Sequence, residues 1–117
     1  MEAITIIELN QLYAAKNFRE LAKHPGIYLL PEVAMELAND KDYGVRNYLA
    51  LNPAIAQLPE VAMALAGNER WTVSAWLALN PAIAQMPEVI LELDKDRFVR
   101  QYLALNPALA EPEIPIR

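Results

Sequence analysis

Two short motifs recur along this chain of 117 residues at nearly constant intervals. Leu-Pro-Glu-Val-Ala-Met begins at Leu30 and again at Leu58, and a shortened form, Met-Pro-Glu-Val, begins at Met86. The second motif is Asn-Pro-Ala, which begins at three positions: Asn52, Asn80 and Asn106. Successive copies lie 28 residues apart, except that the last interval of the second motif is 26 residues. A period of this size is typical of a stacked array of similar units.

The period divides the chain into four units within one domain that spans residues 1–117. The units and the tail that follows them are approximately 1–29, 30–57, 58–85, 86–113 and 114–117. The first unit is degenerate, and it places His24-Pro25 where the later units have Asn-Pro. Terminal units of an array are expected to drift from the consensus, because one side of each faces water.

Each unit predicts two helices followed by a short turn. The first helix begins at a proline such as Pro31, because proline suits the first helical position, where the N–H group has no partner. The second helix covers about residues 43–51, and Asn52-Pro53 ends it, since the residue before a proline is driven out of the α region. The asparagine side chain can cap the next five residues, which suit one turn of 3₁₀ helix. No segment has the alternating pattern of a strand, so the predicted class is all-α.

The ordered motifs Pro-Glu-Val, Leu-Ala, Asp, Val-Arg, Leu-Ala and Asn-Pro resemble the leucine-rich repeat variant family. In the second unit they occupy residues 31–33, 37–38, 40, 45–46, 49–50 and 52–53. The last unit keeps most of this order, whereas the third unit has Ser74 in place of the arginine. The resemblance implies a right-handed solenoid of α-helices and short 3₁₀ helices, here with four helix-pair repeats. The units are longer than that family's usual repeat, so a HEAT-like solenoid stays open as an alternative.

The residue types that are absent or rare in the chain argue against several kinds of catalytic and metal site. It has no cysteine, one histidine (His24) and one serine (Ser74), which argues against disulfides, zinc or iron–sulfur sites and a Ser-His-acid triad. We therefore expect a protein that is not an enzyme and has no catalytic residue, metal or cofactor. The N-terminal residues lack the basic lead of a signal peptide, and no apolar stretch approaches the ~20 residues of a membrane helix. These features predict a cytoplasmic protein without a membrane partner.

The charges are distributed unevenly between the two kinds of helix. The first helices contain nine acidic residues and no lysine or arginine, although the net charge of the chain is only −5. The second helices and the turns before them contain nine basic and four acidic residues. In an array with two rows of helices, one surface is then acidic and the other mildly basic. This difference indicates either ordinary solvated helix surfaces or a basic groove for an acidic partner.

Aromatic and basic residues of the second helices are the candidate binding residues. We expect them to line a concave surface that binds another protein, one with acidic groups: Tyr43, Arg46, Arg70, Trp71, Trp76, Arg97 and Arg100. Aromatic side chains beside arginines give contact area and charge together. Tyr48, Trp76 and Tyr102 occupy equivalent positions in successive units and form a column of aromatic residues. These three rings either contribute to the binding surface or fill the space between units. For the three Asn-Pro asparagines, capping is a sufficient explanation.

Two further partners stay open at this point. A nucleic acid could bind the row of basic residues, although the net charge of −5 disfavours it. A second copy of the chain could pair through the apolar ends of the array, which carry isoleucines: Ile4, Ile6, Ile7, Ile114 and Ile116. The tail cannot continue a helix past Pro112 and Pro115, so it either covers the last unit or docks on a neighbouring molecule.

Overall fold

The computed structural model describes residues 2–109, and these residues form helices and turns without a β-strand. The predicted all-α class is therefore confirmed for that part of the chain. The α-helices are α1 (Glu2–Ala14), α2 (Phe18–Lys23), α3 (Pro31–Ala38), α4 (Tyr43–Leu51), α5 (Pro59–Ala66), α6 (Trp71–Ala78), α7 (Pro87–Leu93) and α8 (Arg97–Leu105). The 3₁₀ segments are η1 (Ile27–Leu29), η2 (Pro53–Gln57), η3 (Pro81–Gln85) and η4 (Pro107–Leu109). The predictions for the tail fall outside the described residues.

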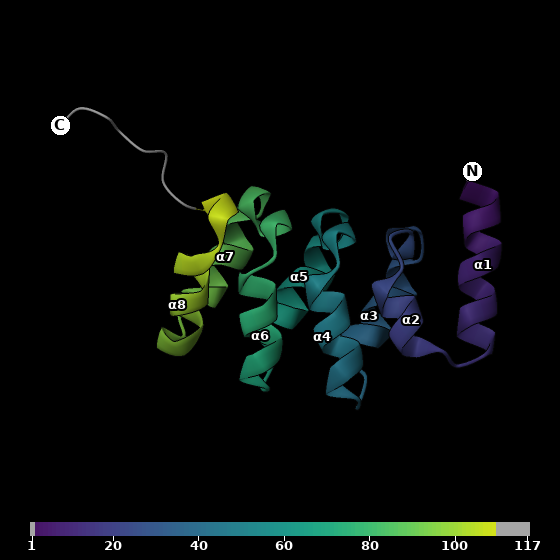
Figure 1. Cartoon of the computed structure of the whole chain (residues 1–117), viewed down its shortest axis with the longest axis horizontal. Helices are drawn as coiled ribbons and strands as arrows, with labels where there is room; N and C mark the ends of the chain where they lie inside the picture. Colours follow the sequence, from purple (N-terminus) through teal and green to yellow (C-terminus); the bar gives the residue numbers. More distant parts are fainter. Residues whose placement is uncertain (1, 110–117) are drawn as a thin grey trace.

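Corresponding elements pack side by side along the molecule. One row contains α2, α4, α6 and α8, and a second row behind it in Figure 1 contains α3, α5 and α7. The four 3₁₀ segments form a third row, since η1, η2, η3 and η4 contact one another in order. The sequence predicted these 3₁₀ turns. It predicted two rows of helices, however, and not that the turns would form a third row. We call each set of neighbours, such as α3, α4 and η2, a layer.

The helix boundaries follow the local sequence signals that predicted them. The helices α3, α5 and α7 each begin at the proline of the first motif, and α4 spans Tyr43–Leu51 as expected. α7 has seven residues where α3 and α5 have eight, which accounts for part of the shorter last interval. A carboxylate caps α4 and α8, because the side chains of Asp42 and Asp96 accept backbone N–H bonds from the first turn.

The core lies between the rows and repeats from layer to layer. Leucines of the front row are buried at equivalent positions: Leu21, Leu49, Leu77 and Leu103. Isoleucines of the third row are buried in the same way: Ile27, Ile55 and Ile83. Val33 is only half-buried, although its equivalents Val61 and Val89 are buried, because α3 is the first helix of its row. No α-helix within residues 2–109 is long and apolar enough to cross a membrane.

Three buried asparagine side chains connect consecutive layers. The Asn80 Nδ2 group donates to the backbone oxygens of Ala50 and Asn52 at 2.8 and 3.1 Å. Its Oδ1 atom accepts the N–H group of Ala82 at 2.9 Å and so caps η3. Asn52 and Asn106 make the same three bonds in their own layers. The predicted capping is thus confirmed but incomplete, because the other half of each side chain joins its layer to the one before.

The first layer replaces this arrangement with one that accommodates α1. His24 stands in the asparagine position; its Nδ1 atom accepts the N–H group of Gly26 at 2.9 Å, and its Nε2 atom contacts Glu8 of α1. Gly26 stands where later layers have alanine, and a Cβ atom added there would lie 2.5 Å from Thr5 Cγ2. Glycine therefore lets α1 approach the end of the array. His24 ends α2, where its backbone N–H group bonds the Leu21 oxygen, and its side chain accepts within the turn that follows.

The asparagine contacts predict a large and specific loss of stability on substitution. Asn80→Ala removes three bonds and leaves the Ala50 carbonyl without its side-chain donor, whereas the Asn52 carbonyl still accepts the Ile55 N–H group, so the free energy of unfolding should fall by about 3 kcal/mol. Asn80→Asp keeps the capping oxygen but loses the donor, and it should be less destabilised at pH 4 than at pH 7, because the neutral carboxyl tolerates burial. Urea unfolding at both pH values checks this. If Asn80→Asp proved as stable as the parent at pH 7, the role of the donor would be contradicted.

The close approach of α1 predicts a mutation and its rescue. Gly26→Ala should displace α1, because the added methyl group collides with the Thr5 methyl group. Thr5→Ser removes that methyl group and keeps the hydroxyl. The Gly26→Ala/Thr5→Ser double variant should therefore recover most of the protection of the α1 amides from hydrogen exchange. Amide hydrogen exchange in α1, with α6 as the internal reference, measures the effect. Equal exchange in the parent and in Gly26→Ala would refute the steric explanation.

Candidate functional site: the face of α4, α6 and α8

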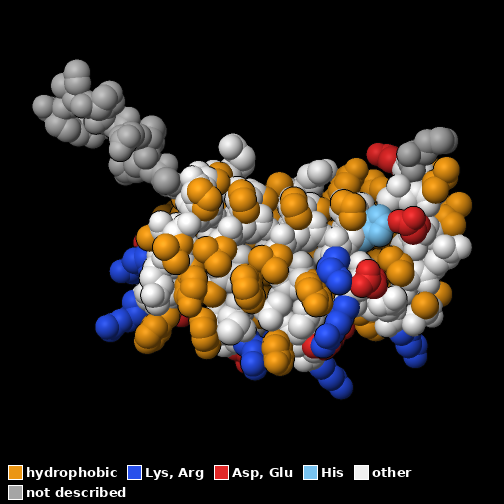
Figure 2. Space-filling model, in the orientation of Figure 1, with side chains coloured by type: hydrophobic (Ala, Val, Ile, Leu, Met, Phe, Trp, Pro, Cys, Tyr) orange, Lys and Arg blue, Asp and Glu red, His pale blue; other side chains and the backbone are white. Residues whose placement is uncertain are grey.

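The face formed by α4, α6 and α8 exposes large hydrophobic side chains. Tyr43, Trp71 and Trp76, all predicted binding residues, are 47%, 53% and 41% exposed. Phe98, at the start of α8, is 65% exposed and was not among the predicted residues. Figure 2 shows hydrophobic side chains over the middle of this face and several lysine and arginine side chains along its lower margin. Exposed apolar and basic side chains therefore lie close to one another on this face.

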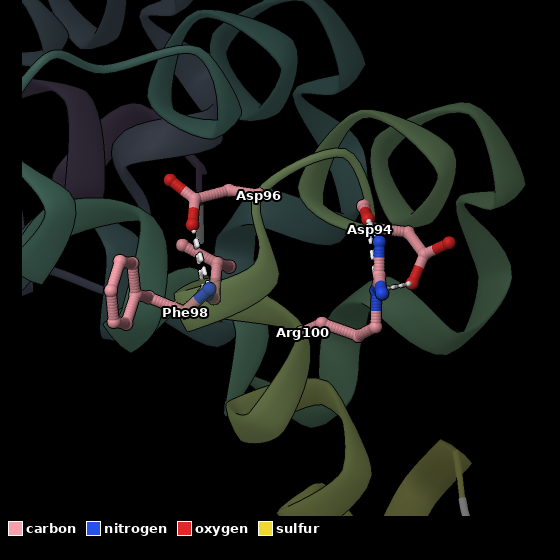
Figure 3. A network of polar contacts seen from close by, with 5 residues as sticks. Asp94, Asp96, Phe98 and Arg100 are labelled. Carbon is pink, nitrogen blue, oxygen red and sulfur yellow. Dashed lines mark hydrogen bonds and ion pairs between the residues drawn. The ribbon is translucent and has the colours of Figure 1, made fainter.

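Three of the exposed aromatic residues lie in the first turn of their helices: Tyr43 and Trp71 begin α4 and α6, and Phe98 is the second residue of α8. Tyr43 directly follows the capping residue Asp42, and Arg97 directly follows Asp96 in the same position of α8. Figure 3 shows the Asp96 carboxylate turned to the N–H group of Phe98, at 2.8 Å. A first-turn side chain has little core beneath it, so its ring lies at the surface. This position accounts for the exposed rings of Tyr43, Trp71 and Phe98 alike.

Two of the four predicted arginines make hydrogen bonds within the protein. Arg100 donates through Nε and Nη2 to the backbone oxygen of Asp94 at 3.2 and 2.8 Å, and its Nε also bonds the Asp94 carboxylate (Figure 3). Arg46 is half-buried and donates to the Asn68 side chain at 3.1 Å. Ser74 holds the equivalent position in α6 and donates to Leu65 and Ala66 oxygens. In α6 and α8 the side chain at this position thus hydrogen bonds to backbone oxygens at the C-terminal end of the preceding helix.

The other two arginines are available at the surface. Arg97 is exposed, and no ion pair or hydrogen bond of its side chain occurs within residues 2–109. The Arg70 guanidinium carbon lies 3.7 Å from the centre of the Tyr43 ring, a cation–π contact between consecutive layers. Arg70 and Arg97 therefore supply positive charge to this face; Arg46, bonded to a neutral amide, keeps its charge as well, whereas Arg100 is paired with the Asp94 carboxylate.

The aromatic column on the face is partly core and partly surface. Tyr48 and Tyr102 are half-buried and pack against the core cluster, and the Lys23 ammonium group lies 4.6 Å from the centre of the Tyr48 ring. Trp76, in the same column, is exposed. The Trp71 ring stacks on Tyr102 of the next layer, with ring centres 6.3 Å apart and an interplanar angle of 29°. Tyr48 and Tyr102 therefore fill space between the layers, whereas the Trp76 ring is exposed.

A groove lies between α6 and α8 on this face. Its volume is about 200 Å³, and six residues line it: Trp71, Thr72, Ala75, Trp76, Leu79 and Tyr102. Trp71 also borders two neighbouring hollows, one lined in part by Arg70 and the other in part by Arg97. We call these six residues the tryptophan groove. It can accept an apolar side chain next to two cationic groups.

An ion pair between consecutive layers fixes the turn before α4. Arg19 Nε lies 2.9 Å from Asp42 Oδ2, and Nη2 lies 3.2 Å from Oδ1, so the contact is bidentate. The hydrogen bond from Arg19, followed by that from the Gly44 N–H group, lowers the pKa of Asp42, and the same hydrogen bond raises the pKa of Arg19. On α1, a hydrogen bond to Glu36 raises the pKa of Tyr13.

The described residues contain no group of three or more histidine, cysteine or acidic side chains that could hold a metal ion. Comparison of the chain with protein-family models, with curated proteins and with solved structures finds no match. The function is therefore inferred from the geometry of this face alone.

The Arg19–Asp42 pair predicts a pH effect of defined sign. Because the pKa of Asp42 is lowered in the folded state, this pair stabilises the fold above the unfolded-state pKa, and the contribution is lost as the pH falls through the folded-state pKa. Arg19→Gln should raise the pKa of Asp42 toward that of a free aspartate, as measured by carboxyl NMR titration. Arg70→Gln is the matched control, since Arg70 contacts Tyr43. An unchanged pKa of Asp42 in Arg19→Gln would disprove the coupling.

Proposed function

We propose that this protein is a non-catalytic binding module, a right-handed solenoid of four helix-pair repeats that binds a partner protein on the face of α4, α6 and α8. The observation that carries the proposal is the exposure of Tyr43, Trp71, Trp76 and Phe98 together on that face. Exposed aromatic residues near arginines are the typical anchors of protein interfaces. The repeat of equivalent elements supports the solenoid part of the proposal.

The partner that this face suits best is a protein segment with acidic residues. Arg70 and Arg97 supply positive charge beside the tryptophan groove, and the other surface carries the glutamates that begin α3, α5 and α7. A partner with carboxylates would therefore be attracted to one face and repelled by the other.

The use of the arginines argues against the alternative partner, a nucleic acid. Binding along a phosphate backbone needs several free cationic side chains in a row. Arg19, Arg46 and Arg100 instead hydrogen bond to groups of the protein itself. The two remaining arginines of the face lie beside aromatic rings, an arrangement that suits a protein ligand better.

Truncation of the groove tests the proposed function. The intact protein, immobilised, should retain a partner from a lysate of its native cell, and Trp71→Ala/Trp76→Ala should retain at least about tenfold less, as expected for interface anchors. Leu91→Ala is the control, because Leu91 is a hydrophobic residue of the other row of helices and is 66% exposed, more than either tryptophan. Circular dichroism verifies the helix content of both variants. Equal retention of every protein by the parent and by both variants would refute binding at this face.

A further inference from the structure

A second groove lies on the row of α3, α5 and α7, which the proposed function does not use. It runs between α3 and the start of α5, and its volume is about 400 Å³. Its apolar lining consists of the buried Leu58 and Val61, the half-buried Met35 and the exposed Pro31 and Pro59. We call it the α3–α5 groove. It can accept an aliphatic group on its floor.

The carboxylates that border this groove have no counter-ion. Glu32 and Glu60 line it and are exposed, and neither side chain makes an ion pair within residues 2–109. The segments α3, α5, α7, η2 and η3 contain no lysine, arginine or histidine. The helix dipole accounts for a glutamate at each helix start, but not for an apolar groove between two of them. A ligand with positive charge therefore complements this groove.

The spacing of the carboxylates along the row indicates the backbone shape of such a ligand. Glu32, Glu60 and Glu88 are equivalent residues of helices that pack side by side, and packed helices lie about 8–10 Å apart. A polyproline II segment has three residues per turn and returns to the same face about every 9 Å. In a β-strand, by contrast, residues three apart point to opposite faces. A polyproline II segment with a cation at every third residue therefore matches the row.

We propose that the α3–α5 groove binds a basic segment of a partner protein in polyproline II conformation, with a lysine or arginine between Glu32 and Glu60. The aliphatic part of that side chain lies on Met35 and Pro59, and its charged head reaches the two carboxylates. The cation three residues further along the segment lies between Glu60 and Glu88.

This site goes beyond the proposed function and does not depend on it. The proposed function uses the face of α4, α6 and α8, whereas the α3–α5 groove belongs to the other row of helices. The two surfaces also differ in the ligand charge that they attract. Binding at each of them can therefore be measured separately.

Titration of the full chain with a basic peptide, followed by NMR of the backbone amides, tests the inference. The probe is Arg-Pro-Pro-Arg-Pro-Pro-Arg, acetylated and amidated so that only its guanidinium groups are charged. It should shift the amide signals of Gln57, Leu58, Glu60 and Val61 saturably and leave those of α6 unchanged. The Kd should be about 0.1–1 mM, because each exposed ion pair contributes little. No saturable shift at these four amides would overturn the inference.

Two charge-matched variants separate groove binding from attraction to the net charge. Glu32→Gln/Glu60→Gln should bind the probe at least about fivefold more weakly, because both carboxylates beside the cation are lost. Glu20→Gln/Glu69→Gln removes the same charge from exposed residues outside the groove, and its Kd should stay within about twofold of the parent. Circular dichroism verifies the helix content of both variants. Equal weakening in the two variants would overturn the proposal.

A second peptide of the same composition tests the spacing. Pro-Pro-Arg-Arg-Arg-Pro-Pro, with the same blocked ends, carries the same charge, but its arginines point to three different sides of a polyproline II helix. It should bind at least about threefold more weakly than the probe, since one guanidinium group at a time faces the row of carboxylates. Equal affinity for the two peptides would contradict recognition of a polyproline II segment.

The remaining outcomes are distinguishable from failure of the proposed function. Trp71→Ala/Trp76→Ala should bind the probe as the parent does, and loss of binding in that variant would place the peptide on the other face and overturn the proposal. If the parent self-associates in sedimentation and Glu32→Gln/Glu60→Gln does not, the occupant is a second copy, and the proposal of a foreign segment is overturned. If the probe does not bind but a partner is retained through Trp71 and Trp76, this inference fails and the proposed function stands.

Discussion

The rest of the structure depends on the side-chain amide of the Asn-Pro asparagines, which hydrogen bonds both within its own layer and to the layer before it. Each asparagine of the Asn-Pro motif caps its own 3₁₀ segment through Oδ1 and donates through Nδ2 to two carbonyl oxygens of the preceding layer. For Asn80, the Ala50 carbonyl lies in the last turn of α4, where the backbone has no intrahelical donor, and the Asn52 carbonyl also accepts the Ile55 N–H group. Because the groups are buried, the bonds fix the spacing of the layers and not only their contact. The surface of α4, α6 and α8 inherits its regular spacing from them.

The two ends of the array differ for reasons visible in single residues. At the N-terminal end, His24 takes the asparagine position and turns its second nitrogen to Glu8, while Gly26 makes room for α1. At the other end, Ala104 is exposed, although Ala50 and Ala78 at equivalent positions are buried. The first end is thus closed by a helix of a different kind, and the last described layer has an uncovered side.

The sequence predicted much of the fold because its signals are local. Prolines fix helix starts, Asn-Pro fixes helix ends, and a repeated motif implies repeated packing. Tyr43 and Trp71 were candidates because they are aromatic residues beside arginines, and both are exposed. The contacts of Arg46 and Arg100 could not be predicted, since they depend on where the end of another helix lies. The Nδ2 bonds of the asparagines join residues 26 to 30 positions apart, and no local pattern encodes them.

Hydrogen exchange of the asparagine side-chain amides tests the central role of these bonds most directly. In the native protein, the Nδ2 protons of Asn52, Asn80 and Asn106 should exchange as slowly as the most protected backbone amides of α4 and α6. Their exchange should follow global unfolding, since breaking one layer contact exposes both sides of it. Exchange of these protons at the rate of a free asparagine, with the helices still protected, would contradict that role.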